Sequence, residues 1–387
     1  MQIPKKSLSE LKILYLSPGN LPSQWAHSMQ ISKMSQAFSE KLEKFELVTS
    51  GDLYSSIFGR SVDFKEWYGL NRDFKITYLP THLHLKYPLA QHHPKARFSK
   101  LAIIYALLTK PSLVYTRTPG ILQKSLKLKL PVVAEFHDSF TCREVFKSPY
   151  LLGIVTTSEQ YAREYIDRGL PEDKVLVENN AVDLKIFSPY LDQETARQKV
   201  NFPQNQPVLV YAGHLYEKKG ISTILKLAQL LPKYQFVLVG GWNEDIQKIK
   251  ERCDSEKIKN IQLVGHVPQA KLATYLYAAH ILLLPSQKDA SPLKLFEYMT
   301  AKRPIVASAI PPVMKVLQNE RNALLAEVDN PTSFKKAIQK ILDDSFLSQS
   351  ISQKAFQDVQ KHTWEQRADK ILRFVLERLN IFLSNQK

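Results

Sequence analysis

The sequence contains few of the residues and segments that mark several large classes of protein. Only two of its 387 residues are cysteines, Cys142 and Cys253, too few for a disulfide framework and typical of a reducing compartment. The apolar run 101–108 is far too short to span a bilayer, and no signal-peptide core follows Met1. We therefore expect a globular protein of the cytoplasm.

Signals for metal sites and for nucleoside triphosphate binding are also missing. Cysteine and histidine do not cluster, and no two aspartates lie two positions apart, so the chain lacks an Asp-x-Asp metal motif. A Gly-x-x-x-x-Gly-Lys-Ser/Thr loop does not occur, which argues against a nucleoside triphosphatase. We expect neither a metal ion nor a resident cofactor.

Acidic residues are scarce relative to basic ones. The chain has 37 Asp and Glu against 53 Lys and Arg, a net charge of +16, and residues 1–150 alone contribute +10. Such a field favours a phosphorylated substrate, an acidic membrane surface or nucleic acid. No recognised nucleic-acid-binding module accompanies the charge, so we do not expect nucleic acid. Residues 82–110 are basic before the apolar run 101–108, which fits either contact with an anionic membrane or a solvated loop before a core helix.

Short β-rich runs alternate with helical patterns along the whole chain, which predicts parallel sheets built from βαβ units. The predicted strands are residues 11–16, 45–49, 75–79, 112–116, 132–136, 153–157, 208–212, 236–239, 261–264, 281–284 and 305–307. The predicted helices include residues 29–42, 159–168, 221–231, 269–279, 292–301, 331–342 and 364–382. Domain size then favours two doubly wound α/β domains, residues 1–188 and 189–361, followed by a terminal helical segment, 362–387.

The segment 289–297, with the sequence Asp-Ala-Ser-Pro-Leu-Lys-Leu-Phe-Glu, holds two carboxylates eight positions apart. It follows the predicted strand 281–284, and we expect Ser291 to be the N-cap and Pro292 the first residue of a helix. A helix that starts at the carboxyl end of a sheet strand presents unpaired N–H groups to a phosphate. The segment therefore predicts a site for a phosphorylated ligand between Asp289 and Glu297.

Two further segments follow predicted strands. In the loop 213–220, glycine allows close approach of the backbone and Lys219 can neutralise a diphosphate, although Lys-Lys-Gly turns are common in basic proteins. His137 follows the strand 132–136 and is either a histidine satisfied by a neighbour or a functional residue. Glu135, two positions before His137, lies on the same face of the strand as His137. Asp138 could orient the imidazole, although adjacent residues of a strand point to opposite faces.

Together these segments resemble glycosyltransferase family 4, the glycosyl transferases group 1, whose members have the GT-B fold of two facing Rossmann-like domains. The resemblance covers nearly the whole length and is strongest over residues 208–310. Asp289 and Glu297 are similar to the two acidic residues of the family, of which the first is usually Glu. His214 stands where the family has Arg, and Ala181 stands where it has Gly.

The resemblance implies a retaining, metal-independent glycosyltransferase that uses a UDP- or GDP-sugar as donor. It implies catalytic roles for His137 and Asp289, both at the donor sugar, and a hold on the ribose by Glu297. The substrate-binding residues that it implies are Gly19, Gly213, His214, Lys219, Ser291, Pro292, Leu293, Lys294 and Glu297. The acceptor would be a saccharide or a lipid-linked molecule of polysaccharide or glycolipid synthesis, with residues 82–110 as a candidate contact with the inner face of the cell membrane.

The resemblance implies that the terminal helix crosses back to the N-terminal domain, as it does in the GT-B fold. Two alternatives stay open. One is a nucleotide-sugar epimerase of similar fold, which would rearrange a sugar without an acceptor. The other is a nucleotide-sugar-binding protein without catalysis, because residues 181, 214 and 289 depart from the family pattern.

Overall fold

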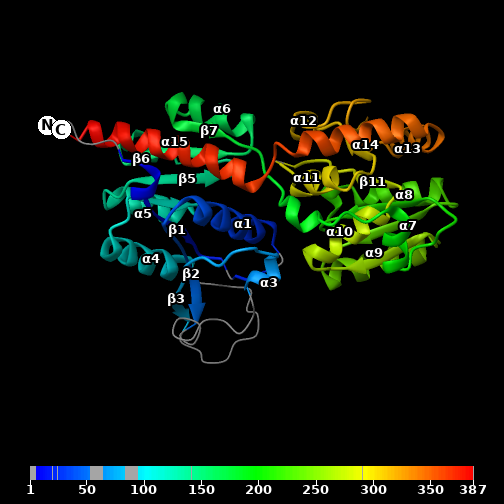
Figure 1. Cartoon of the computed structure of the whole chain (residues 1–387), viewed down its shortest axis with the longest axis horizontal. Helices are drawn as coiled ribbons and strands as arrows, with labels where there is room; N and C mark the ends of the chain where they lie inside the picture. The colour runs from blue at the N-terminus through cyan, green and yellow to red at the C-terminus, as the bar shows by residue number, and fades with distance from the viewer. Residues whose placement is uncertain are drawn as a thin grey trace. The chain divides into compact units, whose positions relative to one another are not determined.

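The computed structural model describes residues 6–19, 21–23, 25–52, 64–82, 95–140, 142–289 and 291–386. The chain divides into two compact α/β units (Figure 1). The first contains Met1–Asn180 and Trp364–Lys387, and the second contains Ala181–Thr363. The sequence placed these two boundaries after residues 188 and 361.

The first unit is built on a parallel sheet that has seven strands within the described residues, in the order β3-β2-β1-β4-β5-β6-β7. The strands are β1 (Lys12–Ser17), β2 (Lys44–Asp52), β3 (Ile76–His82), β4 (Leu113–Thr116), β5 (Val132–Phe136), β6 (Leu151–Thr156) and β7 (Val175–Val177). The helices are α1 (Ala26–Lys41), α3 (Phe64–Tyr68), α4 (Lys95–Thr109), α5 (Pro119–Lys127), α6 (Glu159–Asp167) and α15 (Trp364–Ser384).

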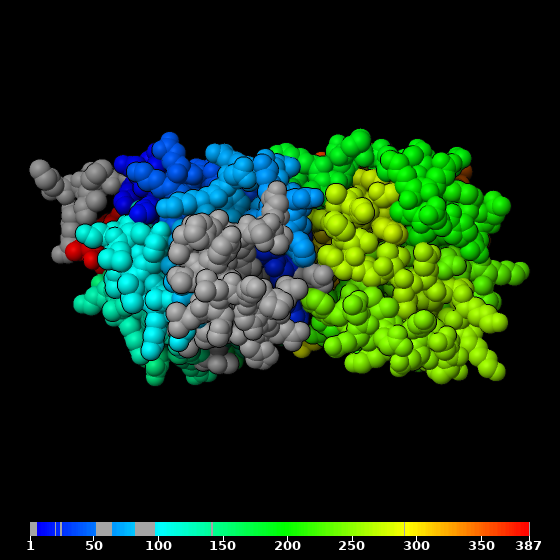
Figure 2. All heavy atoms as spheres, turned by 90° about the horizontal axis from the view of Figure 1, so that it is seen from below, coloured from blue at the N-terminus to red at the C-terminus, as the bar shows by residue number. Residues whose placement is uncertain are grey.

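The second unit has a parallel sheet of six strands, in the order β10-β9-β8-β11-β12-β13. The strands are β8 (Val208–Ala212), β9 (Gln235–Val239), β10 (Ile261–Gly265), β11 (Ile281–Leu284), β12 (Ile305–Ser308) and β13 (Leu324–Ala326). The helices are α7 (Gln193–Lys199), α8 (Ile221–Leu230), α9 (Asn243–Ser255), α10 (Gln269–Ala278), α11 (Leu293–Thr300), α12 (Pro311–Met314), α13 (Pro331–Asp343) and α14 (Ser345–Val359). In Figure 2 the yellow-green and yellow surface of this unit belongs to the segments of α9 and α10.

The predicted fold class of doubly wound parallel sheets is confirmed, because every predicted strand is present. The central strands are continuous apolar runs buried along their whole length, such as β11, as expected for strands covered on both faces. β7 and β13 were not predicted because a run of three residues carries no periodic signal. Helix starts follow capping rules: Asn330 accepts a hydrogen bond from the Ser333 amide and Pro331 opens α13.

The C-terminal helix α15 belongs to the first unit, as predicted, although its sequence lies after the second. It packs against α1 and β6 (Figure 1). The ring of Phe374 lies so close to β6 that a Cβ added at Gly153 would be 2.4 Å from its Cζ atom. Glycine at this strand position is therefore required by the close approach of the helix.

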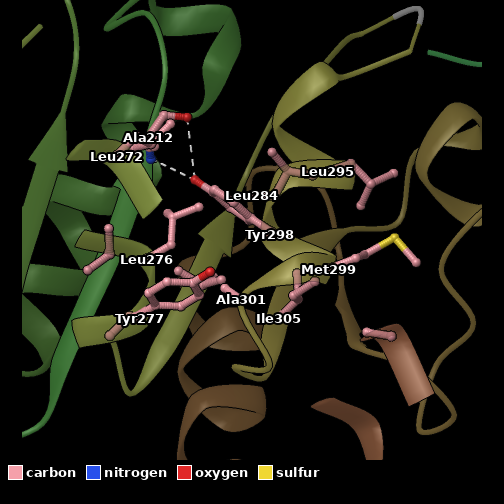
Figure 3. Close-up of a cluster of buried hydrophobic side chains, with 14 of the residues drawn as sticks. Ala212, Leu272, Leu276, Tyr277, Leu284, Leu295, Tyr298, Met299, Ala301 and Ile305 are labelled. Atoms are coloured by element: carbon pink, nitrogen blue, oxygen red, sulfur yellow. Dashed lines mark hydrogen bonds between the residues drawn. The ribbon is translucent and has the colours of Figure 1, made fainter. Parts of the chain in front are cut away.

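Tyr298 on α11 ties the core of the second unit to the end of its central strand. Its ring is buried among apolar side chains of α10, α11 and β12, including Leu276 and Ile305 (Figure 3). Its hydroxyl accepts a hydrogen bond of 2.6 Å from the backbone amide of Ala212, the last residue of β8. One phenol thus fixes α11 to the strand after which the loop 213–220 begins.

We expect the substitution Tyr298→Phe to lower the free energy of unfolding by about 1–3 kcal/mol, because it leaves the buried Ala212 amide without its acceptor. Urea unfolding followed by circular dichroism measures this loss. Tyr275→Phe on the neighbouring helix is the control, since the Tyr275 hydroxyl makes no hydrogen bond with the described residues. Equal effects of the two substitutions would contradict the role given to Tyr298.

Candidate functional site

The predicted ligand-binding loops lie at the switch point of the second sheet. β8 and β11 are neighbours, and the strand order runs outward in opposite directions from this pair. In open α/β sheets, the loops that follow two such strands diverge and leave room for a ligand at the carboxyl edge. The loops 213–220 and 285–292 follow β8 and β11, so the structure brings both predicted segments to the same edge.

Gly220 holds these two loops in contact. Its φ angle is +82°, a conformation that other residues rarely adopt, and it starts α8. A Cβ at this position would lie 1.9 Å from the carbonyl oxygen of Pro285, the first residue after β11. The amide of Gln287 also donates to the carbonyl of Lys218 at 3.0 Å. The backbones of the two loops are therefore joined directly.

The contact of the loops brings Lys219 and Asp289 together as an ion pair between Nζ and Oδ2. Both side chains are mostly buried, with 25% of Lys219 and 13% of Asp289 exposed. Asp289, although one methylene shorter than the Glu usual in the family that the sequence resembles, reaches the Lys219 ammonium. The two residues belong to separate sequence motifs, and the fold brings their side chains into contact.

The loop after β11 enters α11 one residue later than predicted. Pro292 has extended backbone angles and is the N-cap residue, and the helix begins at Leu293. The prediction that Ser291 is the N-cap and Pro292 the first helical residue is therefore wrong by one position. The ψ angle of Pro292 is 116°, which lies outside the helical region. The first amides of α11 still have no partner within the helix, as an anion site requires.

Glu297, one turn into α11, is a buried carboxylate with a partner on each oxygen. Lys294 Nζ donates to Oε2 at 2.7 Å, and Gln269 Nε2 from α10 donates to Oε1 at 3.1 Å. These contacts fix the carboxylate in place. Each carboxylate oxygen has two lone pairs, so Glu297 can still accept hydrogen bonds from ligand hydroxyls.

His214 belongs to a stack of rings at the same edge of the sheet. Its ring lies parallel to that of Tyr216, with centroids 5.1 Å apart, and 6.2 Å from the ring of Trp242. Burial lowers the pKa of His214, and the charges of Lys219 and Lys294 lower it further. The imidazole is consequently neutral at pH 7 and does not supply the cation that the family pattern has at this position.

A second histidine responds to the same charges. Burial lowers the pKa of His266, which follows β10, and Lys294 again contributes. The loop ends therefore combine two ammonium groups with two neutral imidazoles, a set that can receive an anion. Among the residues that the structure describes, no group of three or more His, Cys, Asp and Glu side chains is arranged to hold a metal ion.

His137 and Gly19 lie in the first unit, at the carboxyl ends of β5 and β1. The carbonyl of Gly19 accepts a hydrogen bond of 2.6 Å from Thr49 Oγ1 on β2, which fixes the turn. His137 Nε2 lies 2.7 Å from Glu135 Oε1, so Glu135 and not Asp138 orients the imidazole. Burial and the nearby charge of Arg117 lower the pKa of His137 to about 4.

Three residues around His137 were not identified from the sequence: Tyr115, Arg117 and Arg367. Arg367 carried a detectable signal, because it lies four residues before Ile371 and eight before Val375, on the apolar stripe of α15. A charged residue on the buried face of a helix needs a buried partner. Arg117 and Tyr115 gave no such signal, because nothing in their local sequence distinguishes them from other residues at a strand end.

The C-terminal half matches a known family. Residues 192–358 match the family model described as glycosyl transferases group 1. The matched segment is less than half of the chain, and through it the chain is similar to the glycosyl transferases group 1. It is 24% identical over 218 residues to a D-inositol 3-phosphate glycosyltransferase of Nocardioides sp., an alignment that covers 51% of this chain and 47% of that protein. The chain thus spans about half the length of the curated relatives that it matches.

Solved structures extend the likeness to the whole chain. Sucrose-phosphate synthase from Thermosynechococcus elongatus has a TM-score of 0.77 and 17% identity, covering 95% of this chain and 99% of that one. Anabaena HepE in complex with UDP and glucose has a TM-score of 0.73 and 15% identity, covering 94% and 100%. The fold of the chain is therefore the predicted GT-B fold, and Lys219, Asp289 and Glu297 all lie inside the segment that matches the family model.

We expect Gly220→Ala to destabilise the second unit strongly, because the added methyl group would overlap Pro285. Gly169→Ala is the matched control: Gly169 also has a positive φ, +99°, but a Cβ there meets nothing within 4 Å. Gly169→Ala should lower the free energy of unfolding by only about 1–2 kcal/mol, the cost of a left-handed backbone conformation at a residue other than glycine. Urea midpoints of the two variants compare them, and equal losses would mean that the contact between the loops is not tight.

Proposed function

We propose that the protein is a retaining glycosyltransferase, which moves a sugar from a nucleotide-diphospho-sugar to a hydroxyl acceptor. The observation that carries the proposal is the meeting of Lys219, Asp289 and the start of α11 at the switch point of the second sheet. The match of residues 192–358 to the family model of the glycosyl transferases group 1 supports it. This combination supplies positive charge for a diphosphate and carboxylates for sugar hydroxyls.

The diphosphate of the donor binds between Lys219 and the first amides of α11. Its negative charge increases as the glycosidic bond breaks, so an ammonium and oriented N–H groups stabilise the transition state more than the ground state. These fixed groups supply the stabilisation without a metal ion. Asp289, held beside Lys219, then turns its free carboxylate oxygen to a hydroxyl of the donor sugar.

Glu297 binds the ribose hydroxyls of the nucleotide. Lys294 and Gln269 hold its carboxylate still, which reduces the entropy lost on binding. Tyr216 and Trp242, linked by a hydrogen bond of 3.3 Å, offer ring faces to the nucleobase at the ends of β8 and β9. The solved Anabaena structure contains UDP, which favours a UDP-sugar over a GDP-sugar as the first donor to test.

Retention requires no base from the protein. The oxygen of the departing phosphate takes the proton of the acceptor hydroxyl on the same face of the sugar as the new bond forms. The protein's task is then to position donor and acceptor and to exclude water. The resemblance assigns a contact with the donor sugar to His137, whose ring is neutral at pH 7.

The outer face of α4 is the proposed contact with a membrane that contains a lipid-linked acceptor. One side of α4 is buried in the core through Phe98, Ala102 and Ala106. The opposite side is basic and apolar: Lys100 is exposed, followed by Ile104 (54% exposed) and Leu108 (76%). The helix is therefore a core helix on one face and a candidate membrane contact on the opposite face. The cyan surface at the left of Figure 2 is that of α4.

Basic residues before exposed apolar side chains match the chemistry of an anionic bilayer surface. Residues 83–94 of the predicted segment 82–110 lie outside the described residues. In the part of the chain that the structure does describe, no helix combines the length and the apolar character needed to cross a membrane. The proposal is therefore one of contact at the surface, through α4.

The donor site is tested with Lys219→Met and Glu297→Gln. We expect each to weaken the binding of UDP-glucose by about 10–100-fold, the effect of losing one hydrogen bond to a charged group. Isothermal titration calorimetry measures the affinity, and transfer to acceptor extracts measures activity. Lys226→Met, an exposed position on α8, is the control and should bind as the wild-type protein does.

The outcomes separate the candidate functions. Loss of binding and of transfer in both variants supports the glycosyltransferase. Conversion of the donor to an isomer without an acceptor would instead identify an epimerase, and tight binding without turnover would identify a binding protein. Unchanged binding of UDP-, GDP- and other nucleotide-sugars in both variants would contradict the site itself.

The membrane surface is tested with the double variant Ile104→Ser and Leu108→Ser. We expect its binding to vesicles that contain anionic phospholipid to fall at least about tenfold, because two exposed apolar side chains no longer enter the interface. Flotation or sedimentation of vesicles measures binding. Phe346→Ser, which alters an even more exposed residue on α14, is the control. Binding that falls equally in both, or in neither, would contradict a specific role of α4.

A further inference from the structure

We infer that Arg367 and Glu135 are positioning residues, which hold the His137 ring with its proton on Nε2 and leave Nδ1 as an acceptor for a substrate hydroxyl. The two residues come from α15 and β5, and 232 residues separate them in the sequence. Only the identity of the hydroxyl rests on the proposed function. The state of the ring is a property of the first unit alone.

Glu135 is the centre of a buried network. Its side chain has no exposed surface, and its Oε1 atom accepts three hydrogen bonds. The donors are His137 Nε2 at 2.7 Å, Gln30 Nε2 at 2.6 Å and Arg367 Nη2 at 2.8 Å. The hydroxyl of Tyr115 donates to Oε2 at 2.5 Å. A buried carboxylate with this many donors is ionised, and the pKa of Glu135 is well below its usual value despite burial, because Arg367 and His137 stabilise the charge.

The geometry determines which nitrogen of His137 carries the proton. An unprotonated Nε2 at 2.7 Å from a carboxylate oxygen would place two lone pairs against each other. Gln30 Nε2 also lies 3.1 Å from His137 Nε2, but it donates to Glu135 Oε1 at the shorter distance of 2.6 Å. Arg117 donates to Gln30 Oε1 and so fixes the amide in this orientation. Nε2 therefore carries the proton and donates to Glu135.

The other nitrogen is then available. Since the ring is neutral near pH 7, Nδ1 is unprotonated and can only accept a hydrogen bond. No described residue donates to it, and 17% of the side chain is exposed. A sugar hydroxyl is the donor that fits the proposed reaction.

Arg367 connects this arrangement to the C-terminal helix. Its Nε donates to the carbonyl of Asn179 at 2.9 Å while its Nη2 holds Glu135. Its side chain is 2% exposed, so its charge acts on the network without screening by water. Without Arg367, Glu135 would be a buried carboxylate beside His137 with no cation in contact, and the pair would bind a proton more readily.

Among the described residues, three charged groups act on the ring of His137. Burial and Arg117 lower the pKa of His137, Arg367 lowers it further, and Glu135 raises it. The Tyr115 hydroxyl from β4 belongs to the network, and the ring of Tyr15 from β1 packs edge-on against the ring of Tyr115, with centroids 5.0 Å apart. Burial raises the pKa of each tyrosine above its ordinary range. Removing Arg367 should therefore raise the pKa of His137.

The test is nuclear magnetic resonance of the full chain labelled with ¹⁵N in histidine, with the His137 signals assigned by their loss in His137→Gln. For the wild-type protein we expect a neutral ring with the proton on Nε2 throughout the range from about pH 5.5 to about pH 8. For Arg367→Met we expect protonation of the Glu135–His137 pair to move up by about 1–3 pH units, the usual effect of one nearby charge. For Glu135→Gln we expect the preference for the Nε2–H tautomer to be lost.

Arg378→Met is the matched control. Arg378 is the other mostly buried arginine of α15 and pairs with Asp173, away from His137. Its loss should weaken docking of the helix but leave the His137 signals unchanged. If Arg367→Met fails to fold, Arg367→Lys keeps the charge but not both hydrogen bonds, and we expect a smaller shift in the same direction.

Three results would overturn the inference: a proton on Nδ1 in the wild-type protein, a doubly protonated ring near pH 7, or equal spectra of His137 in the Arg367→Met and Arg378→Met variants. Failure of the proposed function looks different. In that case the tautomer is as inferred, but His137→Gln leaves donor binding and transfer unchanged.

Discussion

The parallel pairing of β8 with β11 is the constraint on which the candidate site depends. Parallel strands end at one edge of their sheet, so the loops that follow adjacent strands start about 5 Å apart. The two halves of the sheet then extend in opposite directions, which turns the helices α8 and α11 away from each other. Lys219 and Asp289 meet because each lies in the loop of one of these two strands.

Local chemistry refines what the topology allows. Glycine at position 220 lets the two loops touch, and Tyr298 ties the start of one loop to the helix that follows the other. Both residues fix the distance between the backbones of the loops 213–220 and 285–292. At this distance a side chain as short as that of Asp289 reaches Lys219.

The sequence predicts the sheets well, because a continuous apolar run such as 281–284 leaves few alternatives to a buried parallel strand. Motif spacing also identifies Lys219, Asp289 and Glu297, since all lie within ten residues of a predicted strand. The ion pair between Lys219 and Asp289 could not be predicted, because strand order is a long-range property. The same reason applies to Glu135 and Arg367, whose contact depends on a helix that returns from the far end of the chain.

The position of α15 also has a consequence for the order in which the protein is made. Synthesis proceeds from the N-terminus, and the residues that complete the first unit are the last 24 of the chain, Trp364–Lys387. The second unit, Ala181–Thr363, emerges from the ribosome whole while the first still lacks the partner of Glu135. The unit whose synthesis begins first is thus the unit that is completed last. A chain whose synthesis stops within α15 has a complete second unit and an incomplete first unit.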